Sequence, residues 1–251
     1  MAYVICKRQS QQVGRLPGAD CVIYSRHGAI PVDGVFMPRV PDNPNNRSVA
    51  AILLREGGVV AYPTDTVYGL GAAVFNANGV STLFAIKGRG REQGVPVLIA
   101  SDSQLREVAV DVPDAALALA ARFWPGQLTL VLSRHPDLPM GITGGASTVA
   151  VRLPDHPCPQ TLISACGGPI TGTSANKHGG PEPLSAEDVH QQLGNRVGLI
   201  LDGGPSPRSL PSTIVDVTSV PARLLRLGAI SLDELRAVCA ITVPDPARSG
   251  E

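Results

Sequence analysis

Hydrophobic positions alternate between helical and strand spacing along most of the chain. Val49, Ile52 and Leu53 recur at helical spacing before Gly57, and the apolar run at 58–62 that follows predicts a buried strand. Helices are also predicted from about 76 and about 113 and over 159–166, with strands at 96–100, 127–132, 148–153, 169–173, 197–201, 212–217 and 222–226. Short units of both kinds therefore follow one another from about residue 46.

Local signals at the helix ends support this pattern. Ser185-x-x-Asp188 and Ser231-x-x-Glu234 have the spacing of capping boxes, and Pro113 suits the first turn of a helix. Late in the chain, the gaps between predicted strands are short enough for hairpins, whereas the earlier gaps are long enough for crossover connections. The sequence therefore predicts an α/β fold with a mixed sheet.

The first part of the chain differs from the rest. Residues 1–45 show scattered basic residues and no sustained period, which indicates an arm or small hairpin with strands at 3–6 and 21–24. The stretch at 41–46, PDNPNN, is typical of a linker. We therefore expect an arm over 1–45, a catalytic domain over 46–239 and a tail over 240–251, with Met37 as an alternative start.

Composition narrows the class of protein. A hydrophobic content of 43% in 251 residues is enough for a globular core, and 21 basic residues balance 21 acidic ones, so the net charge favours neither nucleic acid nor a membrane surface. Five cysteines without a C-x-x-C pair argue against a disulfide framework or a zinc site. With no signal peptide or membrane-length apolar run, we expect a cytoplasmic protein.

The candidate chemistry begins where the strand at 58–62 ends. The segment VVAYPTDTVYGLG at 59–71 changes abruptly from apolar residues to Thr64, Asp65, Thr66 and Tyr68. Its two glycines, at 69 and 71, would let a ligand or another backbone come close. An ordinary turn with capping hydroxyls is the alternative interpretation.

Two further clusters carry polar groups suited to anions. KGRGR at 87–91 offers Lys87 and Arg89 as a clamp for phosphate or carboxylate, although basic residues at a helix C-terminus also simply complement the helix dipole. GGPITGTSAN at 167–176 ends a short strand in Thr173, Ser174 and Asn176, whose hydroxyls and amide suit phosphate oxygens, ribose or an amino acid. A turn or helix cap would use the same residues.

Three smaller features complete the set. Thr148, Ala150 and Arg152 alternate along one predicted strand and should share a face, while Ser212 and Arg226 stand at the ends of late strands. The sequence contains no phosphate-binding P-loop, dinucleotide fingerprint, G-x-S-x-G or zinc-ligand spacing.

Together these motifs resemble the YrdC-like family, the threonylcarbamoyl-adenylate synthases. The resemblance rests on YPTDTVYGLG, KGRGR, FWPGQLTL, VAVRLPDHP, TGTSAN and STIVDVT in this order, over roughly residues 46–239. It implies a twisted mixed sheet with flanking helices and one concave site. The implied reaction joins L-threonine, bicarbonate and ATP into threonylcarbamoyl-AMP and pyrophosphate. A downstream transferase complex would then modify the adenosine next to the anticodon of tRNAs.

The resemblance also implies roles for individual residues. It assigns catalysis to Lys87, Arg89, Ser174 and Asn176; L-threonine binding to Thr64, Arg152 and Ser212; and nucleotide binding to Lys87, Arg89, Thr148, Ser174 and Arg226. Mg²⁺ is expected to enter with ATP, although the sequence identifies no ligands for it. A weak tRNA contact and no membrane contact are also expected.

The chain departs from the family pattern in three places. The segment after Arg89 is longer, Leu227 replaces a common proline, and Glu182 stands where a hydroxyl is usual. The end of the chain soon after the helix at Ser231 indicates the short, single-domain form. Two other functions stay open, namely a non-catalytic RNA-binding module and a carbamoyl-adenylate-forming domain with another acceptor.

Overall fold

The computed structural model describes residues 39–90, 92–207 and 210–243, and the backbone of three short strands closer to the N-terminus. These strands, β1 (Tyr3–Ile5), β2 (Val22–Ser25) and β3 (Gly28–Pro31), pair in this order as an antiparallel sheet. β1 and β2 confirm the two strands predicted in the arm. The alternative start at Met37 and the chain after 243 lie outside the described residues.

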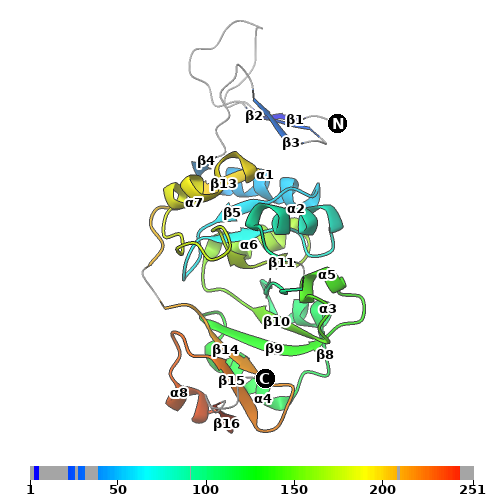
Figure 1. Cartoon of the computed structure of the whole chain (residues 1–251), viewed down its shortest axis with the longest axis vertical. Coiled ribbons are helices and arrows are strands. Elements are labelled where there is room, and N and C mark those ends of the chain that lie inside the picture. The colour runs from blue at the N-terminus through cyan, green and yellow to red at the C-terminus, as the bar shows by residue number, and fades with distance from the viewer. Residues whose placement is uncertain are drawn as a thin grey trace, which may run out of the picture.

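The main body contains two mixed sheets, which Figure 1 shows one above the other. The larger sheet has eight strands, of which β8 pairs only with β9. In spatial order its members are β11 (Ile170–Thr171), β7 (Val97–Leu98), β10 (Thr148–Arg152), β9 (Leu128–Arg134), β14 (Thr213–Asp216), β15 (Ala222–Arg226) and β16 (Ile241–Thr242), with β8 (Ala109–Val110) beside them. β16 lies in the predicted tail, so the sheet extends past residue 239.

The smaller sheet has five strands and contains the segment with the threonines. Its order is β12 (Thr173–Ser174), β6 (Gly69–Gly71), β5 (Val60–Tyr62), β13 (Leu199–Asp202) and β4 (Arg39–Pro41). Both sheets combine parallel and antiparallel pairs. The predicted α/β fold with a mixed sheet is therefore confirmed, as two sheets.

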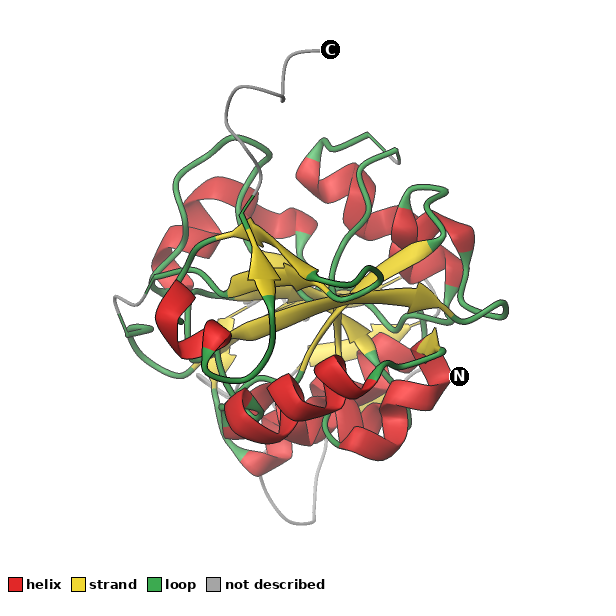
Figure 2. Cartoon of the chain, turned by 90° about the horizontal axis from the view of Figure 1, so that it is seen from below, coloured by secondary structure: helices red, strands yellow, loops and turns green. Residues whose placement is uncertain are grey.

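Helices surround the strands on the outside of the molecule (Figure 2). They are α1 (Pro44–Arg55), α2 (Ala77–Lys87), α3 (Leu105–Val108), α4 (Asp114–Phe123), α5 (Met140–Thr143), α6 (Pro157–Cys166), α7 (Ala186–Leu193) and α8 (Leu232–Arg236), with 3₁₀ turns η1 (Asp102–Gln104) and η2 (Gly194–Arg196). The capping boxes of α7 and α8 form as predicted. Within the described ranges, no helix combines the length and apolarity that a membrane crossing requires.

The linker predicted at 41–46 is wrong. Arg39–Pro41 is a strand that pairs in parallel with β13, and α1 begins only three residues later, at Pro44. Asn43 caps this helix, because its side chain accepts a hydrogen bond from the amide of Asn46 at 2.9 Å. The Asn-Pro pair that resembled a linker is an N-cap followed by proline at the first helical position.

The alternating residues of β9 divide the larger sheet into a core face and a cavity face. Leu128, Leu130 and Leu132 are fully buried in a hydrophobic core together with Leu119 of α4. Thr129 and Val131 point to the opposite face, because successive side chains of a strand alternate. A polar site can therefore lie on one face while the other face holds the core.

One short segment, residues 170–174, joins the two sheets. Its first half is β11, which pairs with β7 of the larger sheet, and its second half is β12, which pairs with β6 of the smaller sheet. The amide of Gly172, between them, donates to Pro96 O at 2.8 Å, and the amide of Thr171 donates to Ala72 O at 2.9 Å. The predicted strand at 169–173 thus becomes two strands, one in each sheet.

The glycines at 69 and 71 make room for a neighbouring tyrosine ring. A Cβ on Gly69 would lie 2.7 Å from Tyr62 Cε2, and one on Gly71 would lie 2.8 Å from Tyr62 Cε1. Tyr62 is fully buried and donates its hydroxyl to Thr171 O at 2.9 Å. At Gly71 the expected approach of another backbone is confirmed, because an added Cβ would also lie 3.2 Å from Thr171 O. The expected approach of a ligand is wrong for the space at Gly69, because the Tyr62 side chain of β5 occupies it.

Candidate functional site

A cavity of about 550 Å³ lies where the two sheets meet. It is walled by the cavity face of β9, β10 and β14, the end of β15, strand β12, and parts of the loops around 66 and 94. Its polar and charged lining residues are Thr66, Arg89, Thr129, Thr143, Thr148, Arg152, Thr173, Ser174, Glu182, Ser212 and Arg226. Segments far apart in the sequence therefore contribute to one concave surface.

The structure brings most of the predicted site residues to this cavity. Its lining includes Arg89, Thr148, Arg152, Ser174, Ser212 and Arg226. Thr148, Ala150 and Arg152 line it together, so the shared face predicted from their alternation is confirmed. Thr64, Lys87 and Asn176 are buried next to the cavity and do not belong to its lining.

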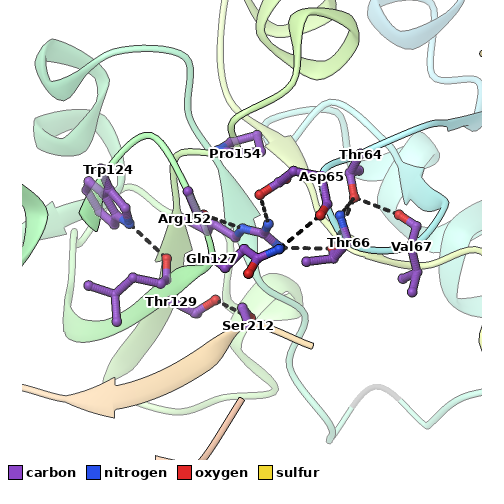
Figure 3. A network of polar contacts seen from close by, with 12 residues as sticks. Thr64, Asp65, Thr66, Val67, Trp124, Gln127, Thr129, Arg152, Pro154 and Ser212 are labelled. Carbon is purple, nitrogen blue, oxygen red and sulfur yellow. Dashed lines mark hydrogen bonds and ion pairs between the residues drawn. The ribbon is translucent and has the colours of Figure 1, made fainter. Parts of the chain in front are cut away.

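Arg152 is held at the cavity wall by hydrogen bonds and an ion pair (Figure 3). Its Nε donates to Gly126 O at 2.9 Å, its Nη1 to Thr66 Oγ1 at 3.2 Å, and its Nη2 to Asp65 Oδ2 at 2.6 Å. The Arg152 and Asp65 side chains are only 10% and 12% exposed, so this ion pair is largely shielded from water. The guanidinium is fixed at the end of β10 with its remaining N–H groups available.

Thr64 shapes the turn that presents its neighbours. Its hydroxyl accepts the amide of Thr66 at 3.0 Å, donates to Val67 O at 2.7 Å, and lies 3.0 Å from Thr66 Oγ1. These local contacts occupy the Thr64 hydroxyl inside the turn, as Figure 3 also shows. It is Thr66 that reaches the cavity wall, and contact of Thr64 with a substrate stays a prediction.

A second group of polar side chains lies at the ends of β14 and β15. Ser212 Oγ is 2.8 Å from Thr129 Oγ1, and Arg226 Nη2 donates to Ser212 Oγ at 3.1 Å and to Ser212 O at 2.8 Å. Burial and the nearby charge of Arg152 lower the pKa of Arg226, and Glu182 opposes this shift. This group provides a cation and two hydroxyls on the same wall.

Lys87 supports the loop that carries Ser174 and Asn176. Its Nζ donates to Ser174 O at 2.6 Å, and to the backbone O and side-chain Oδ1 of Asn176 at 3.1 Å each. An ammonium has three N–H donors, so all of them have acceptors in this loop. Burial, and next the charge of Arg89, lower the pKa of Lys87 to about 8. Direct phosphate contact by Lys87 stays a prediction.

Asn176 is similarly engaged within its own loop. Its Oδ1 accepts the Ser174 hydroxyl at 2.7 Å, and its Nδ2 donates to Gly180 O at 2.7 Å. Ser174 is only partly buried and lines the cavity, so its oxygen can still accept a hydrogen bond there. In this arrangement Asn176 orients Ser174.

Arg89 is the third guanidinium of the cavity. Burial lowers its pKa, against the opposing charge of Glu92. Among the described residues, no acceptor lies within hydrogen-bond distance of its buried Nε. Glu182 is the carboxylate among the lining residues, so three guanidiniums outnumber it and the cavity suits anions.

Sequence reasoning missed some of the residues that complete the site. Thr129 could have been found, because in LTLVLSR it alternates with buried leucines, just as Thr148 alternates with buried valines in TVAVR. Gln127, whose Nε2 donates to Asp65 O at 3.0 Å, had no such signal. Its role depends on two loops that only the fold brings together.

The arrangement can hold two anionic groups near one another. Arg152 of β10 lies beside Thr66, and Arg226 of β15 lies beside Ser212, with β9 and β14 between the two arginines on one wall. Guanidiniums pair with carboxylate and phosphate through parallel N–H bonds, and hydroxyls add further hydrogen bonds. Such a site can align a carboxylate-bearing substrate with a phosphate-bearing one.

Comparisons with known proteins agree with this picture. A family model named Sua5_yciO_yrdC and described as "Telomere recombination" matches residues 52–228. A threonylcarbamoyl-AMP synthase of Pyrococcus abyssi is 42% identical over 203 residues, which cover 81% of this chain and 60% of the relative. One of Bacillus subtilis is 44% identical over 190 residues, which cover 75% of this chain and 55% of the relative.

A shorter relative and a solved structure complete the comparison. A putative threonylcarbamoyl-AMP synthase of Mycobacterium tuberculosis is 38% identical over 202 residues, covering 80% of this chain and 93% of the relative. The crystal structure of P. abyssi Sua5 complexed with L-threonine superposes with a TM-score of 0.76 at 40% identity, covering 81% of this chain and 61% of that one. The chain thus spans 55–60% of the length of the P. abyssi and B. subtilis relatives.

Proposed function

Because the chain belongs to the Sua5–YciO–YrdC family, we propose that it is an enzyme that condenses L-threonine, bicarbonate and ATP into threonylcarbamoyl-AMP and pyrophosphate. The observation that carries the proposal is the cavity at the sheet junction, where Arg89, Arg152 and Arg226 meet hydroxyl side chains. This set suits one carboxylate and one polyphosphate. The name of the relatives, threonylcarbamoyl-AMP synthase, supports the product, and the L-threonine complex of P. abyssi Sua5 supports the amino-acid substrate.

In the proposed complex, the amino acid lies at the Arg152 end of the cavity. Arg152 would pair with its carboxylate, and Ser212 would contact its polar groups. Arg89 and Arg226 would face the phosphates, with Thr148 and Ser174 along the nucleotide. Lys87 and Asn176 would hold the Ser174 loop, and Thr64 would hold Thr66, because their polar atoms already have partners there.

The reaction needs positioning more than covalent help from the protein. The amine nitrogen of threonine attacks the carbon of bicarbonate, which gives a carbamate with loss of water. A carbamate oxygen then attacks the α-phosphorus of ATP, and the bond to the leaving pyrophosphate breaks. Fixed guanidiniums stabilise charge on the phosphoryl oxygens, and the rigid wall keeps the reactants close.

A magnesium ion is proposed to enter with ATP and to neutralise phosphate charge. Mg²⁺ commonly binds through one or two carboxylates together with substrate phosphates. Glu182 and the Ser174 hydroxyl are oxygen donors of the lining that fit this use. Within the described ranges no group of three metal-ligating side chains occurs, so the phosphates would supply most ligands.

The product would serve a downstream transferase complex that modifies tRNA, with at most a weak tRNA contact by this chain. The cytoplasmic location expected from the sequence belongs to the same proposal, because ATP and tRNA are both available there. No membrane partner is proposed.

The proposal is tested by pyrophosphate release from ATP, with mass spectrometry of the product. We expect release that requires both bicarbonate and L-threonine, and a product with the mass of threonylcarbamoyl-AMP. Arg89→Gln should lower kcat about 10²-fold, since one charge-stabilising donor is lost. The matched control is Arg106→Gln, which removes an exposed arginine of α3 outside the cavity.

Two outcomes would favour the other functions. Release that needs ATP and bicarbonate but is indifferent to L-threonine would contradict the substrate and favour another carbamoyl acceptor. Salt-sensitive RNA binding without nucleotide turnover would favour the RNA-binding module.

A further inference from the structure

The two ends of the cavity differ in how their cations are compensated. At one end Arg152 has a carboxylate, Asp65, at 2.6 Å. No ion pair within 4.0 Å joins either of the other two lining arginines, Arg89 and Arg226, to a described acidic residue, and Glu92 and Glu182 act on them only from farther away. The charge of Arg152 is therefore compensated by a carboxylate in contact, whereas the charges of Arg89 and Arg226 are not.

Asp65 contacts Arg152 from behind the cavity lining, so it acts on a ligand through its charge and not by contact. Its backbone oxygen accepts Gln127 Nε2 at 3.0 Å, and the Thr64 turn fixes the backbone on its other side. Asp65 does not belong to the cavity lining, whereas Arg152 and Thr66 do. A ligand in the cavity would thus contact the Arg152 guanidinium, while the Asp65 carboxylate compensates its charge from the side away from the cavity.

Three of the five N–H groups of Arg152 have acceptors among the described residues, one on each nitrogen. One N–H on each of Nη1 and Nη2 is left for a ligand. These two groups suit a carboxylate geometrically, and they suit a phosphate equally well. Geometry alone therefore does not decide which anion binds at this end.

Charge does distinguish the two anions. An amino acid is a zwitterion, so its ammonium gains from the Asp65 carboxylate while its carboxylate gains from Arg152. A polyphosphate carries only negative charge, so Asp65, which is itself largely shielded from water, repels it. Arg89 and Arg226 have no such carboxylate in contact among the described residues.

We propose that Asp65 is a specificity-determining, positioning residue that keeps polyphosphates off Arg152, so that this end of the cavity accepts a zwitterionic amino acid. The inference rests on the proposed function, which supplies the amino acid as the ligand of Arg152. It adds a reason why two substrates that both carry anionic groups would bind at different ends of one cavity.

Titration calorimetry of the full chain at low ionic strength tests this, with inorganic pyrophosphate as the probe. Wild-type protein should bind one pyrophosphate, and L-threonine should not displace it. Asp65→Asn keeps the size and an acceptor oxygen but removes the charge, so it should bind a second pyrophosphate, or bind the anion about tenfold tighter, in competition with L-threonine. Asp65→Asn combined with Arg152→Gln should lose this gain.

The matched control is Asp202→Asn. Asp202 also pairs with an arginine, Arg39, at 2.8 Å, and neither residue lines the cavity. It should leave pyrophosphate binding as in the wild type. If Asp65→Asn binds pyrophosphate like the wild type, or if its gain persists without Arg152, the proposal is overturned.

A second variant keeps the proposal testable even where Asp65→Asn does not fold. Arg152→Gln alone should weaken L-threonine binding about tenfold or more and change pyrophosphate affinity less than about threefold. A tenfold loss of pyrophosphate affinity would mean that Arg152 already binds polyphosphate beside Asp65. Failure of the wild type to bind L-threonine or to release pyrophosphate from ATP would instead contradict the proposed function. The two proposals can be told apart, because comparing pyrophosphate binding between variants requires no turnover.

Discussion

At the scale of single residues, the side-chain alternation of a strand carried reliable information. Thr148 and Arg152 were expected on one face of β10, and both line the cavity. Thr64 and Thr66 also alternate, yet Thr64 bonds within its own turn and Thr66 reaches the wall. The direction of a side chain was predictable inside a strand but not in the turn after it, because the backbone dihedral angles of a turn do not repeat from residue to residue.

Gly69 gives a first prediction. Gly69→Ala should lower the free energy of unfolding by about 1–3 kcal/mol, because the new methyl group would collide with the buried ring of Tyr62. Urea denaturation measures this loss. Gly141→Ala in α5 is the control, since outside its own helix and chain neighbours no atom lies within 4 Å of its added Cβ. Equal effects of the two substitutions would refute the packing role of Gly69.

Lys87 gives a second prediction, on pH. Its pKa is about 8 in the folded chain against the ordinary 10.5, so between these values the unfolded chain binds more protons. The Lys87 contribution to the free energy of unfolding therefore rises with pH across this window. Lys87→Met should remove that rise in denaturation experiments repeated from pH 7 to about 10.5.

Tyrosines and cysteines titrate in the same pH range and add their own pH dependence to the free energy of unfolding. The Lys87 contribution is therefore obtained as the difference between the wild type and the variant. Lys177→Met is the control, since it removes an exposed lysine of the neighbouring loop and retains Lys87. If Lys87→Met and the wild type show the same pH dependence, Lys87 does not hold a lowered pKa.

At the scale of elements, polar residues at helix starts were interpretable where their spacing was distinctive. The boxes at Ser185 and Ser231 predicted α7 and α8, because both partners of the box are visible in the sequence. Asn43 lacks such a partner three residues on, and the prolines around it resembled a linker. Capping residues thus located the starts of α7 and α8 but not the start of α1, whose later turns the apolar spacing predicted.

The start of α1 gives a third prediction. Asn43→Ala should destabilise the protein by about 1 kcal/mol, because the amide of Asn46 loses its capping acceptor. Asn45→Ala, at an exposed position two residues further on, should be neutral or slightly stabilising, since alanine favours the helix. Chemical denaturation of both variants checks this, and an equal loss would argue against the cap.

At the scale of the whole molecule, the two sheets contribute to the same core clusters and share a connecting segment. A single cluster of buried residues includes Ala61 and Leu70 of the smaller sheet and Leu130 and Val151 of the larger sheet. Residues 170–174 pair with both sheets. The cavity lies at this junction, so the site depends on the sheets remaining together.

This sharing gives a fourth prediction, of one cooperative transition for the main body. The single tryptophan, Trp124, donates to Leu128 O at 2.8 Å and reports on the larger sheet, whereas far-ultraviolet circular dichroism reports on both sheets. Their urea transitions should coincide. A dichroism change separate from the fluorescence change would mean that the smaller sheet unfolds independently.

The sequence by itself determined the element types, the mixed α/β class, the two capping boxes and most of the polar and charged cavity residues, because these follow from local periodicity and residue chemistry. The tertiary structure alone decided that there are two sheets, that Tyr62 fills the space beside the glycines, and that Asp65 compensates Arg152. Each of these depends on contacts between segments far apart in the chain. No local sequence pattern shows which side chain from a distant segment will pack at a given position.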